Sequence, residues 1–221
     1  MMTQQRAAAQ RAWIFTSATL GDDDALTWFS EAAGLEDATH LRVGSPFDYP
    51  TNARLYVPPK FPAPQDAPHN TMVGRAAAHC AAALGGRTFV LTTTLRAMKV
   101  VAEALESELG VLGSPLQVLV QGSAAKRALL ARFQEGDSVL VGSQSFWERI
   151  DVPGDALQCV IIDKLPFPPP NDPLVEARVK QLKAQGRDAF NDYFVAEAAV
   201  SLKQGAGRLI RTETDRGLLV I

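Results

Sequence analysis

Short apolar runs alternate with segments of helical periodicity through residues 71–221, and this alternation restricts the possible fold more than any other feature. Continuous apolar runs are typical of strands buried on both faces, and a helix between successive strands favours parallel pairing. We therefore predict an α/β fold, a parallel sheet flanked by helices on both faces. The predicted strands are 88–94, 115–122, 138–146, 157–167 and 217–221. The predicted helices are 71–86, 95–110, 124–136, 172–186 and 191–211.

The N-terminal part of the sequence is less regular. Residues 13–19 predict a short buried strand, and residues 21–35 predict a helix with acidic residues in its first turn. Residues 44–70 are rich in proline and predict an irregular, exposed connection. Residues 1–12 are polar, and we expect them to be flexible or derived from expression cloning. Strand-like runs lie close to both ends, so we expect residues 13–221 to be a domain excised from a larger protein.

Composition excludes several classes of protein. The net charge of −2 argues against a globally basic nucleic-acid binder, although a local basic stripe remains compatible with it. Cys80 and Cys159 form no CxxC pair, so we expect neither a disulfide framework nor a metal site, as suits a reducing cytosol. There is no signal-peptide core and no apolar run of about 18–20 residues, so we expect a cytoplasmic protein without a membrane partner.

The stretch QGAGRLIR contains a candidate phosphate site. On a helix, Gln204, Arg208 and Arg211 are spaced to share one face. Two guanidiniums and an amide there would suit the charge on a transferring γ-phosphate. A solvated cationic helix end would explain the arginines equally well. It would explain Gly205 and Gly207 poorly, since each costs about 1 kcal/mol in a helix.

The stretch SFWERIDVPG follows a predicted strand, where this architecture places ligand contacts. Glu148 and Asp151 are candidate ligand-facing acids, and Phe146 and Trp147 could stack on bases. The alternative is that both aromatic residues are core and the acids cap the next turn.

Hydroxyl groups gather at two further strand ends. Thr16, Ser17, Ala18 and Thr19 form the first group, which could bind phosphate or cap the next helix. Thr93, Thr94 and Arg96 form the second, at the start of a predicted helix. Hydroxyls, backbone N–H groups and a helix N-terminus suit a nucleic-acid backbone, although an ordinary capped helix explains them as well.

The remaining candidates are weaker. Lys164 follows a buried strand and could contact a phosphate or mark the exit of the strand to solvent. His40, His69 and His79 form no pattern with a nucleophile or metal ligands, and we expect structural roles for them. The sequence contains no GxxxxGK[ST] phosphate loop.

Taken in order, these motifs resemble the second motor domain of DinG/XPD-type superfamily 2 DNA helicases, and the bacterial DinG/YoaA branch in particular. The motifs that carry the resemblance are TSATLG, TTTLRAMK, VGSQSFWERIDVPGDAL, VIIDKLPFPPPNDPLVEAR and QGAGRLIRTETDRG, and they extend over nearly the whole chain. The resemblance implies a RecA-like C-terminal helicase domain over residues 13–221 of a 5′-to-3′ helicase in DNA repair or replication. It also implies that a first domain, absent from this sequence, binds most of the ATP and Mg²⁺, and that this domain of the full-length protein could carry an iron–sulfur cluster.

The resemblance also implies residue roles. Arg208 and Arg211 correspond to the arginines that reach the γ-phosphate, with Gln204 opening that motif. Glu148 and Asp151 correspond to the motif that couples ATP to the bound strand. The candidate contacts to single-stranded or forked DNA are Thr93, Thr94, Arg96, Ser143, Gln144 and Trp147. Thr16, Ser17, Ala18 and Thr19 correspond to the third helicase motif.

Two residues depart from the family pattern, and two other functions remain open. Arg149 stands where relatives carry glycine, and Leu95 stands where they often carry an aromatic or polar residue. The chain could instead be a RecA-like nucleic-acid-binding or interaction module without ATPase activity. It could also belong to a motor that acts on RNA or is fused to a nuclease.

Overall fold

The computed structural model describes residues 12–17, 19–21, 24–35, 37–143, 146, 152 and 154–221. The chain divides into two compact units. The first contains residues 1–45 and 167–203, and the second contains residues 46–166 and 204–221.

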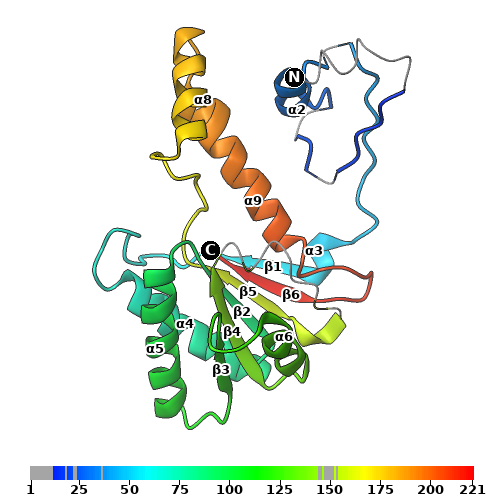
Figure 1. The fold of residues 1–221 in the computed structure, drawn as a ribbon. Coiled ribbons are helices and arrows are strands. Elements are labelled where there is room, and N and C mark those ends of the chain that lie inside the picture. The colour runs from blue at the N-terminus through cyan, green and yellow to red at the C-terminus, as the bar shows by residue number, and fades with distance from the viewer. Residues whose placement is uncertain are drawn as a thin grey trace. The chain divides into compact units, whose positions relative to one another are not determined.

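The second unit is built on a six-stranded sheet, in which all five neighbouring pairs are parallel (Figure 1). The strand order is β1-β6-β5-β2-β4-β3. The strands are β1 (Ala53–Tyr56), β2 (Thr88–Thr92), β3 (Gln117–Val120), β4 (Ser138–Ser143), β5 (Cys159–Ile162) and β6 (Gly217–Val220). The predicted α/β fold with a parallel sheet is therefore confirmed.

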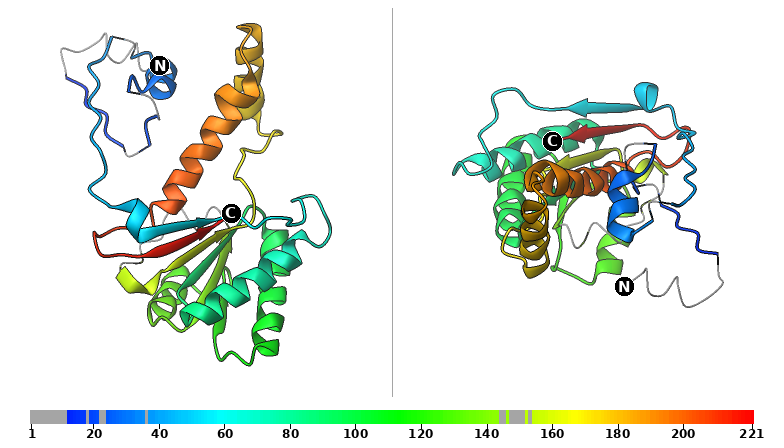
Figure 2. Two further views of the ribbon diagram at one scale, coloured as in Figure 1. Left: turned by 180° about the vertical axis from the view of Figure 1, so that it is seen from behind. Right: turned by 90° about the horizontal axis from the view of Figure 1, so that it is seen from above.

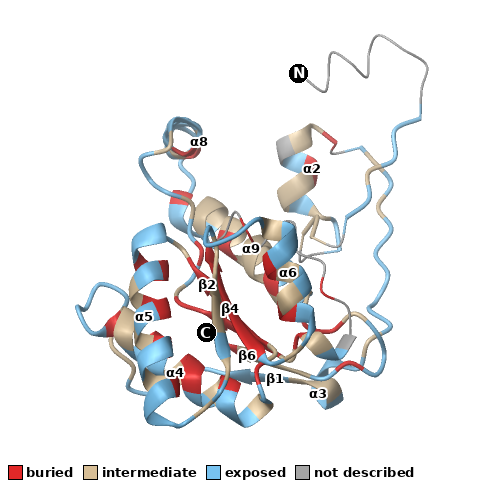
Figure 3. Cartoon of the chain, turned by 60° about the horizontal axis from the view of Figure 1, so that its bottom comes forward, coloured by how far each residue is buried: buried red, intermediate tan, exposed pale blue. Residues whose placement is uncertain are grey.

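Helices pack on both faces of this sheet. Helices α4 (His69–Leu84) and α5 (Leu95–Val111) form one core cluster with the β2 residue Val90. The preceding residue Phe89 points to the other face, where its ring lies 6.5 Å from that of Phe133 in α6 (Lys126–Gln134). This alternation follows from the pleat of a strand. Figure 3 shows the buried strands between helices whose outer sides are exposed.

The Pro-rich connection at residues 44–70 contains regular structure that the sequence pattern did not indicate. Helix α3 (Tyr49–Asn52) is capped by the Asp48 carboxylate, which accepts the Thr51 N–H at 3.2 Å. Strand β1 follows and pairs with β6, so these distant segments lie side by side (Figure 2). The four residues of β1 are half-buried or exposed. Local sequence did not predict β1, because an exposed edge strand lacks the apolar run of the central strands.

The first unit is helical. It contains α2 (Thr27–Ala33), α8 (Pro173–Ala184), the π-helix η2 (Phe190–Val195) and most of α9 (Ala196–Ala206). The prediction of a strand at residues 13–19 is wrong for the described residues 13–17 and 19, which form no strand. A strand is stabilised by hydrogen bonds to a neighbouring strand, and the described sheet lies wholly within the second unit.

Helix α9 ends before the arginines of the QGAGRLIR stretch. Its last residue is Ala206, and residues 207–209 form a turn in which the Arg208 N–H donates to the Gly205 carbonyl at 3.1 Å. The prediction of one helix over residues 191–211 is therefore wrong at its end. Gly207 lies at this break, consistent with the low helix propensity of glycine.

Candidate functional site

The carboxyl ends of β2, β4 and β5 bring together residues from distant motifs. Thr92 is in register with Ser143, and Leu91 is in register with Ile162. Because all three strands are parallel, the residues that follow them lie at the same edge of the sheet. This is the edge at which open α/β sheets bind ligands.

Asp163 is the central residue of this edge, and the sequence analysis did not select it. Its carboxylate accepts the Thr93 N–H at 3.1 and 3.3 Å and the Thr93 hydroxyl at 3.4 Å. Asp163 is only 5% exposed. Burial raises its pKa, although the Thr93 N–H and the nearby charges of Lys164 and His69 act in the opposite direction. The sequence does contain a signal that could have identified Asp163, because a carboxylate directly follows an apolar strand.

Thr94 and Arg96 lie on the exposed start of α5. The Thr94 hydroxyl accepts the Ala97 N–H at 3.1 Å and so caps the helix. Arg96 is exposed, and the Leu95 side chain between them is 59% exposed. The second hydroxyl group of the sequence analysis therefore has distinct structural roles, with Thr93 held by Asp163 and Thr94 capping α5.

Ser143 is held by a glutamine from the neighbouring strand end. Its N–H and hydroxyl both donate to Gln121 Oε1, at 2.7 and 2.9 Å. Ser143 is therefore fixed at the same edge as Thr93. The other candidates of this region, Gln144, Trp147, Glu148 and Asp151, lie outside the described residues, as does Arg149.

Gln204, Arg208 and Arg211 lie on the path from α9 to β6. Gln204 is exposed in the last turn of α9, whereas Arg208 and Arg211 are half-buried. Burial lowers the pKa of both guanidiniums, and the nearby Asp215 opposes that effect at Arg211. An arginine remains protonated despite such a shift, so both side chains keep their charge.

Asp215 fixes the backbone at the second arginine. Its carboxylate accepts the N–H groups of Arg211 and Thr212 at 2.8 and 2.9 Å and the Thr212 hydroxyl at 2.7 Å. Burial alone would raise the Asp215 pKa, but these hydrogen bonds together hold it below its ordinary value. The sequence analysis missed this residue, although aspartate and threonine are both turn-forming residue types.

The TSAT residues belong to the first unit. Ser17 Oγ accepts the Thr19 N–H at 3.2 Å and lies 3.3 Å from the Thr19 hydroxyl. Thr19 also lines a hollow of about 290 Å³ with Arg178 and Lys203. Thr16 is exposed, and Ala18 lies outside the described residues.

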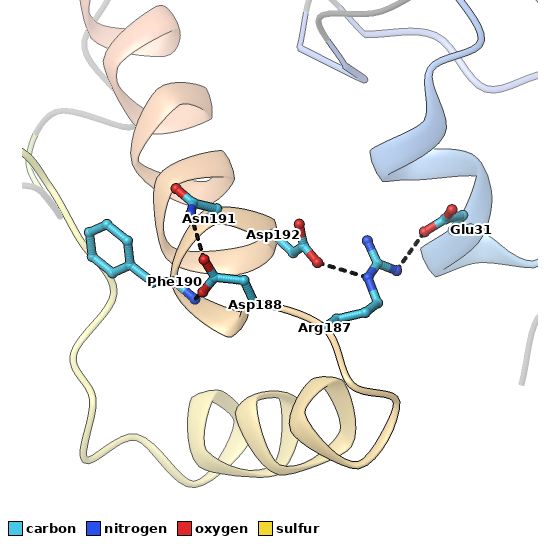
Figure 4. A network of polar contacts seen from close by, with 6 residues as sticks. All are labelled: Glu31, Arg187, Asp188, Phe190, Asn191 and Asp192. Atoms are coloured by element: carbon cyan, nitrogen blue, oxygen red, sulfur yellow. Dashed lines mark hydrogen bonds and ion pairs between the residues drawn. The ribbon is translucent and has the colours of Figure 1, made fainter.

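A polar network in the first unit joins segments far apart in sequence (Figure 4). Arg187 donates to Asp192 at 2.8 Å and to Glu31 at 2.9 Å, and these contacts raise the pKa of its guanidinium. Asp188 accepts the Phe190 N–H at 2.9 Å, beneath the start of η2. These contacts explain how the turn after α8 is held.

The described residues contain no group of three or more His, Cys, Asp and Glu side chains that could hold a metal ion. Within the same residues, no helix combines the length and the apolarity that crossing a bilayer requires.

Comparison with known proteins places these features in a family context. The family model described as "Helicase C-terminal domain" matches residues 78–221. The ATP-dependent DNA helicase YoaA of Haemophilus influenzae is 44% identical over 218 residues, which are 98% of this chain and 33% of the relative. The YoaA of Escherichia coli is 41% identical, over 95% of this chain and 32% of the relative. The chain thus spans about a third of the length of the curated relatives that it matches.

A solved structure supports the fold. The S. tokodaii Xpd4 structure superposes with a TM-score of 0.56 at 15% identity. The match covers 77% of this chain and 34% of that chain.

Proposed function

This chain belongs to the helicase C-terminal domain family, and from that premise we propose that it is the C-terminal motor domain of an ATP-dependent DNA helicase. The observation that carries the proposal is the similarity to helicases of the DinG/YoaA branch over almost the whole chain. The proposed partners are single-stranded or forked DNA and an N-terminal helicase domain of the same protein. The proposal includes 5′-to-3′ movement, a role in DNA repair or replication, and a cytoplasmic location.

In this proposal Arg208 and Arg211 supply positive charge to ATP held mainly by the first domain. The charge on a transferring phosphoryl group is spread over its oxygens, and the planar guanidinium matches that distribution. Half-burial supports the role, because partial removal from water strengthens the interaction of a cation with a phosphate. Gln204, at the exposed end of α9, would contact the same nucleotide.

The proposed DNA contacts lie at the carboxyl edge of the sheet. Thr94 and Arg96 are exposed at the positive end of α5, which suits a phosphate. Thr93 and Ser143 are fixed beside them by Asp163 and Gln121. Among the residues outside the described part, Gln144 and Trp147 are proposed to contact the strand, and Glu148 and Asp151 to couple it to ATP.

This chain offers few ligands for Mg²⁺ or for an iron–sulfur cluster. Two cysteines cannot hold a cluster that needs four thiolates, and the described residues contain no group of three or more His, Cys, Asp and Glu side chains that could hold a metal ion. Mg²⁺ would supply positive charge that offsets the charge on the phosphates of ATP, and we assign its protein ligands to the first domain.

The test is ATP hydrolysis by the full-length protein with DNA present. R208A and R211A are each expected to lower kcat by about 10³-fold or more, because an arginine finger contributes about 10³–10⁵. R75A is the matched control, since Arg75 is an exposed residue of α4 and contacts Glu108 near the C-terminal end of α5. This chain alone is expected to hydrolyse no ATP. Turnover by the isolated chain that disappears in R208A would overturn the assignment of ATP binding to another domain.

A nucleic-acid-binding module without ATPase activity is the second candidate, favoured by the lack of a phosphate loop in the 221 residues. Strand-separation assays on DNA and RNA forks of both polarities distinguish the two. DNA binding by the full-length protein without ATP hydrolysis would favour the module.

A further inference from the structure

His69 contacts Asp163 at the same edge of the sheet, and both of its ring nitrogens lie within hydrogen-bond distance of carbonyl oxygens. It is the first residue of α4 and is only 4% exposed. Its Nδ1 lies 2.8 Å from the Pro62 carbonyl oxygen, and its Nε2 lies 2.9 Å from the Asp163 carbonyl oxygen. Both ring nitrogens therefore face groups that can only accept a hydrogen bond.

This arrangement selects one protonation state of the ring. A neutral imidazole has one N–H and one lone pair, whereas the imidazolium has two N–H groups. In the neutral form, one lone pair would point at a carbonyl oxygen within hydrogen-bond distance and would remain unsatisfied away from water. Only the imidazolium satisfies both contacts.

The surroundings can support a buried cation. Asp163 supplies the accepting carbonyl and also a carboxylate, whose pKa is raised by burial and lowered in part by the charge of His69. Two further charged groups lie close to His69 or Asp163 in sequence. Lys164 follows Asp163, and Asp66, three residues before His69, has a carboxylate that accepts the Ala63 N–H. The positive end of α4 opposes a cation at its first residue, but two charge-assisted hydrogen bonds outweigh a single helix-dipole effect.

Asp163 connects His69 with the candidate DNA site through hydrogen bonds. The carbonyl of Asp163 accepts from His69, and its carboxylate accepts from the N–H and hydroxyl of Thr93. The same residue donates its own N–H to the Leu91 carbonyl at 3.0 Å. The His69 ring thus joins the Pro-rich connection and α4 to the ends of β5 and β2.

We propose that His69 is a buried imidazolium at neutral pH and a positioning residue, which holds Asp163 and through it the backbone of Thr93. The part of this proposal that concerns DNA rests on the proposed function, whereas the protonation state does not. Loss of the proton would remove one of the two ring hydrogen bonds.

The protonation state is tested on the unaltered chain. With ¹⁵N-labelled histidine, NMR distinguishes a ring with two N–H groups from either neutral tautomer. His40, His69 and His79 are the three histidines, so three spin systems suffice for assignment. Two protonated nitrogens at His69 at about pH 7, protected from solvent exchange, are expected. A neutral ring with one protonated nitrogen at that pH would overturn the proposal.

The positioning role is tested with H69Q and the matched control H79Q. His79 is on the same helix, but its side chain is 61% exposed and faces Glu108. In H69Q the Thr93 amide should lose protection from hydrogen exchange at least tenfold, and the Kd for a single-stranded oligonucleotide should rise about tenfold. H79Q should change the exchange protection of the Thr93 amide and the Kd for the oligonucleotide by no more than about twofold.

The outcomes separate this proposal from the proposed function. If the unaltered chain binds no DNA, the proposed function fails at this site, while the NMR and Thr93 exchange results still decide the role of His69. Thr93 amide protection in H69Q that stays within about twofold of the wild type would overturn the positioning role. If H69Q does not fold, the ring-nitrogen spectrum of the unaltered chain decides.

Discussion

The Asp163 carboxylate accepts the Thr93 N–H at 3.1 Å and so connects the residue that follows β5 with the residue that follows β2. A serine or threonine at a strand end is otherwise free to turn toward solvent. Here the backbone of Thr93 is fixed by a buried acid, so the start of α5 is presented in one orientation. The exposed residues Thr94 and Arg96 take their position from this pair.

D163N tests this pair. The amide keeps one acceptor oxygen but presents its NH₂ group to the other Thr93 donor, so we expect a loss of about 1–3 kcal/mol in the free energy of unfolding. Burial raises the Asp163 pKa, so the folded state binds the proton more tightly than the unfolded state. The difference in the free energy of unfolding between the wild type and D163N should therefore shrink as the pH rises through the range in which carboxyl groups titrate. Urea unfolding at several pH values measures it, and an advantage that grows with pH would contradict the assignment.

T94A separates the capping role of Thr94 from any contact with DNA. Loss of the hydroxyl that accepts the Ala97 N–H should lower the free energy of unfolding by about 1 kcal/mol, as is typical of N-caps. T94N keeps a capping acceptor and should retain nearly all of the stability. If T94N matches the wild type in thermal unfolding but binds single-stranded DNA more weakly, the hydroxyl itself contacts the strand. Equal stability of T94A and the wild type would show that the cap is unimportant.

G74A tests the close approach of α4 to α5. A Cβ at Gly74 would lie 2.6 Å from the Val101 carbonyl oxygen and 2.8 Å from the Ala104 Cβ. Overpacking costs about 1–3 kcal/mol and should exceed the gain of about 1 kcal/mol in helix propensity. G110A is the control, because nothing lies within 4 Å of its added Cβ. Denaturant midpoints should fall for G74A and rise for G110A, and a rise for both would contradict the close packing.

D215N tests how the turn after Arg211 is held. The Asp215 pKa is lowered by its hydrogen bonds despite burial, so the folded state favours the ionised form. The contribution of Asp215 to the free energy of unfolding should be complete above the pH range in which carboxyl groups ordinarily titrate. It should be lost as the pH falls through the pKa of Asp215 in the folded state. D215N should therefore be less stable than the wild type by about 1–3 kcal/mol at neutral pH, with a smaller difference in acid. Acid-induced unfolding followed by circular dichroism measures this, and a difference independent of pH would refute the role of the charge.

Local patterns predicted most of the second unit. The central strands β2, β4 and β5 are continuous apolar runs, and α4 and α5 show helical periodicity with glycine after or near the last turn. Each signal lies within a few residues, so it can be interpreted without knowledge of the rest of the chain. The errors occurred where the local signal was weak, as at the exposed edge strand β1 and at the end of α9.

Only the tertiary structure decided which side chains meet. The sequence determined the alternation of strands and helices, and hence a parallel sheet whose carboxyl edge collects the candidate residues. It did not determine that Asp163 would hold Thr93 or that both nitrogens of His69 would face carbonyl oxygens. These contacts depend on the order and register of strands that are distant in the chain. That order is set by packing and hydrogen bonding across the whole sheet, which no local periodicity encodes.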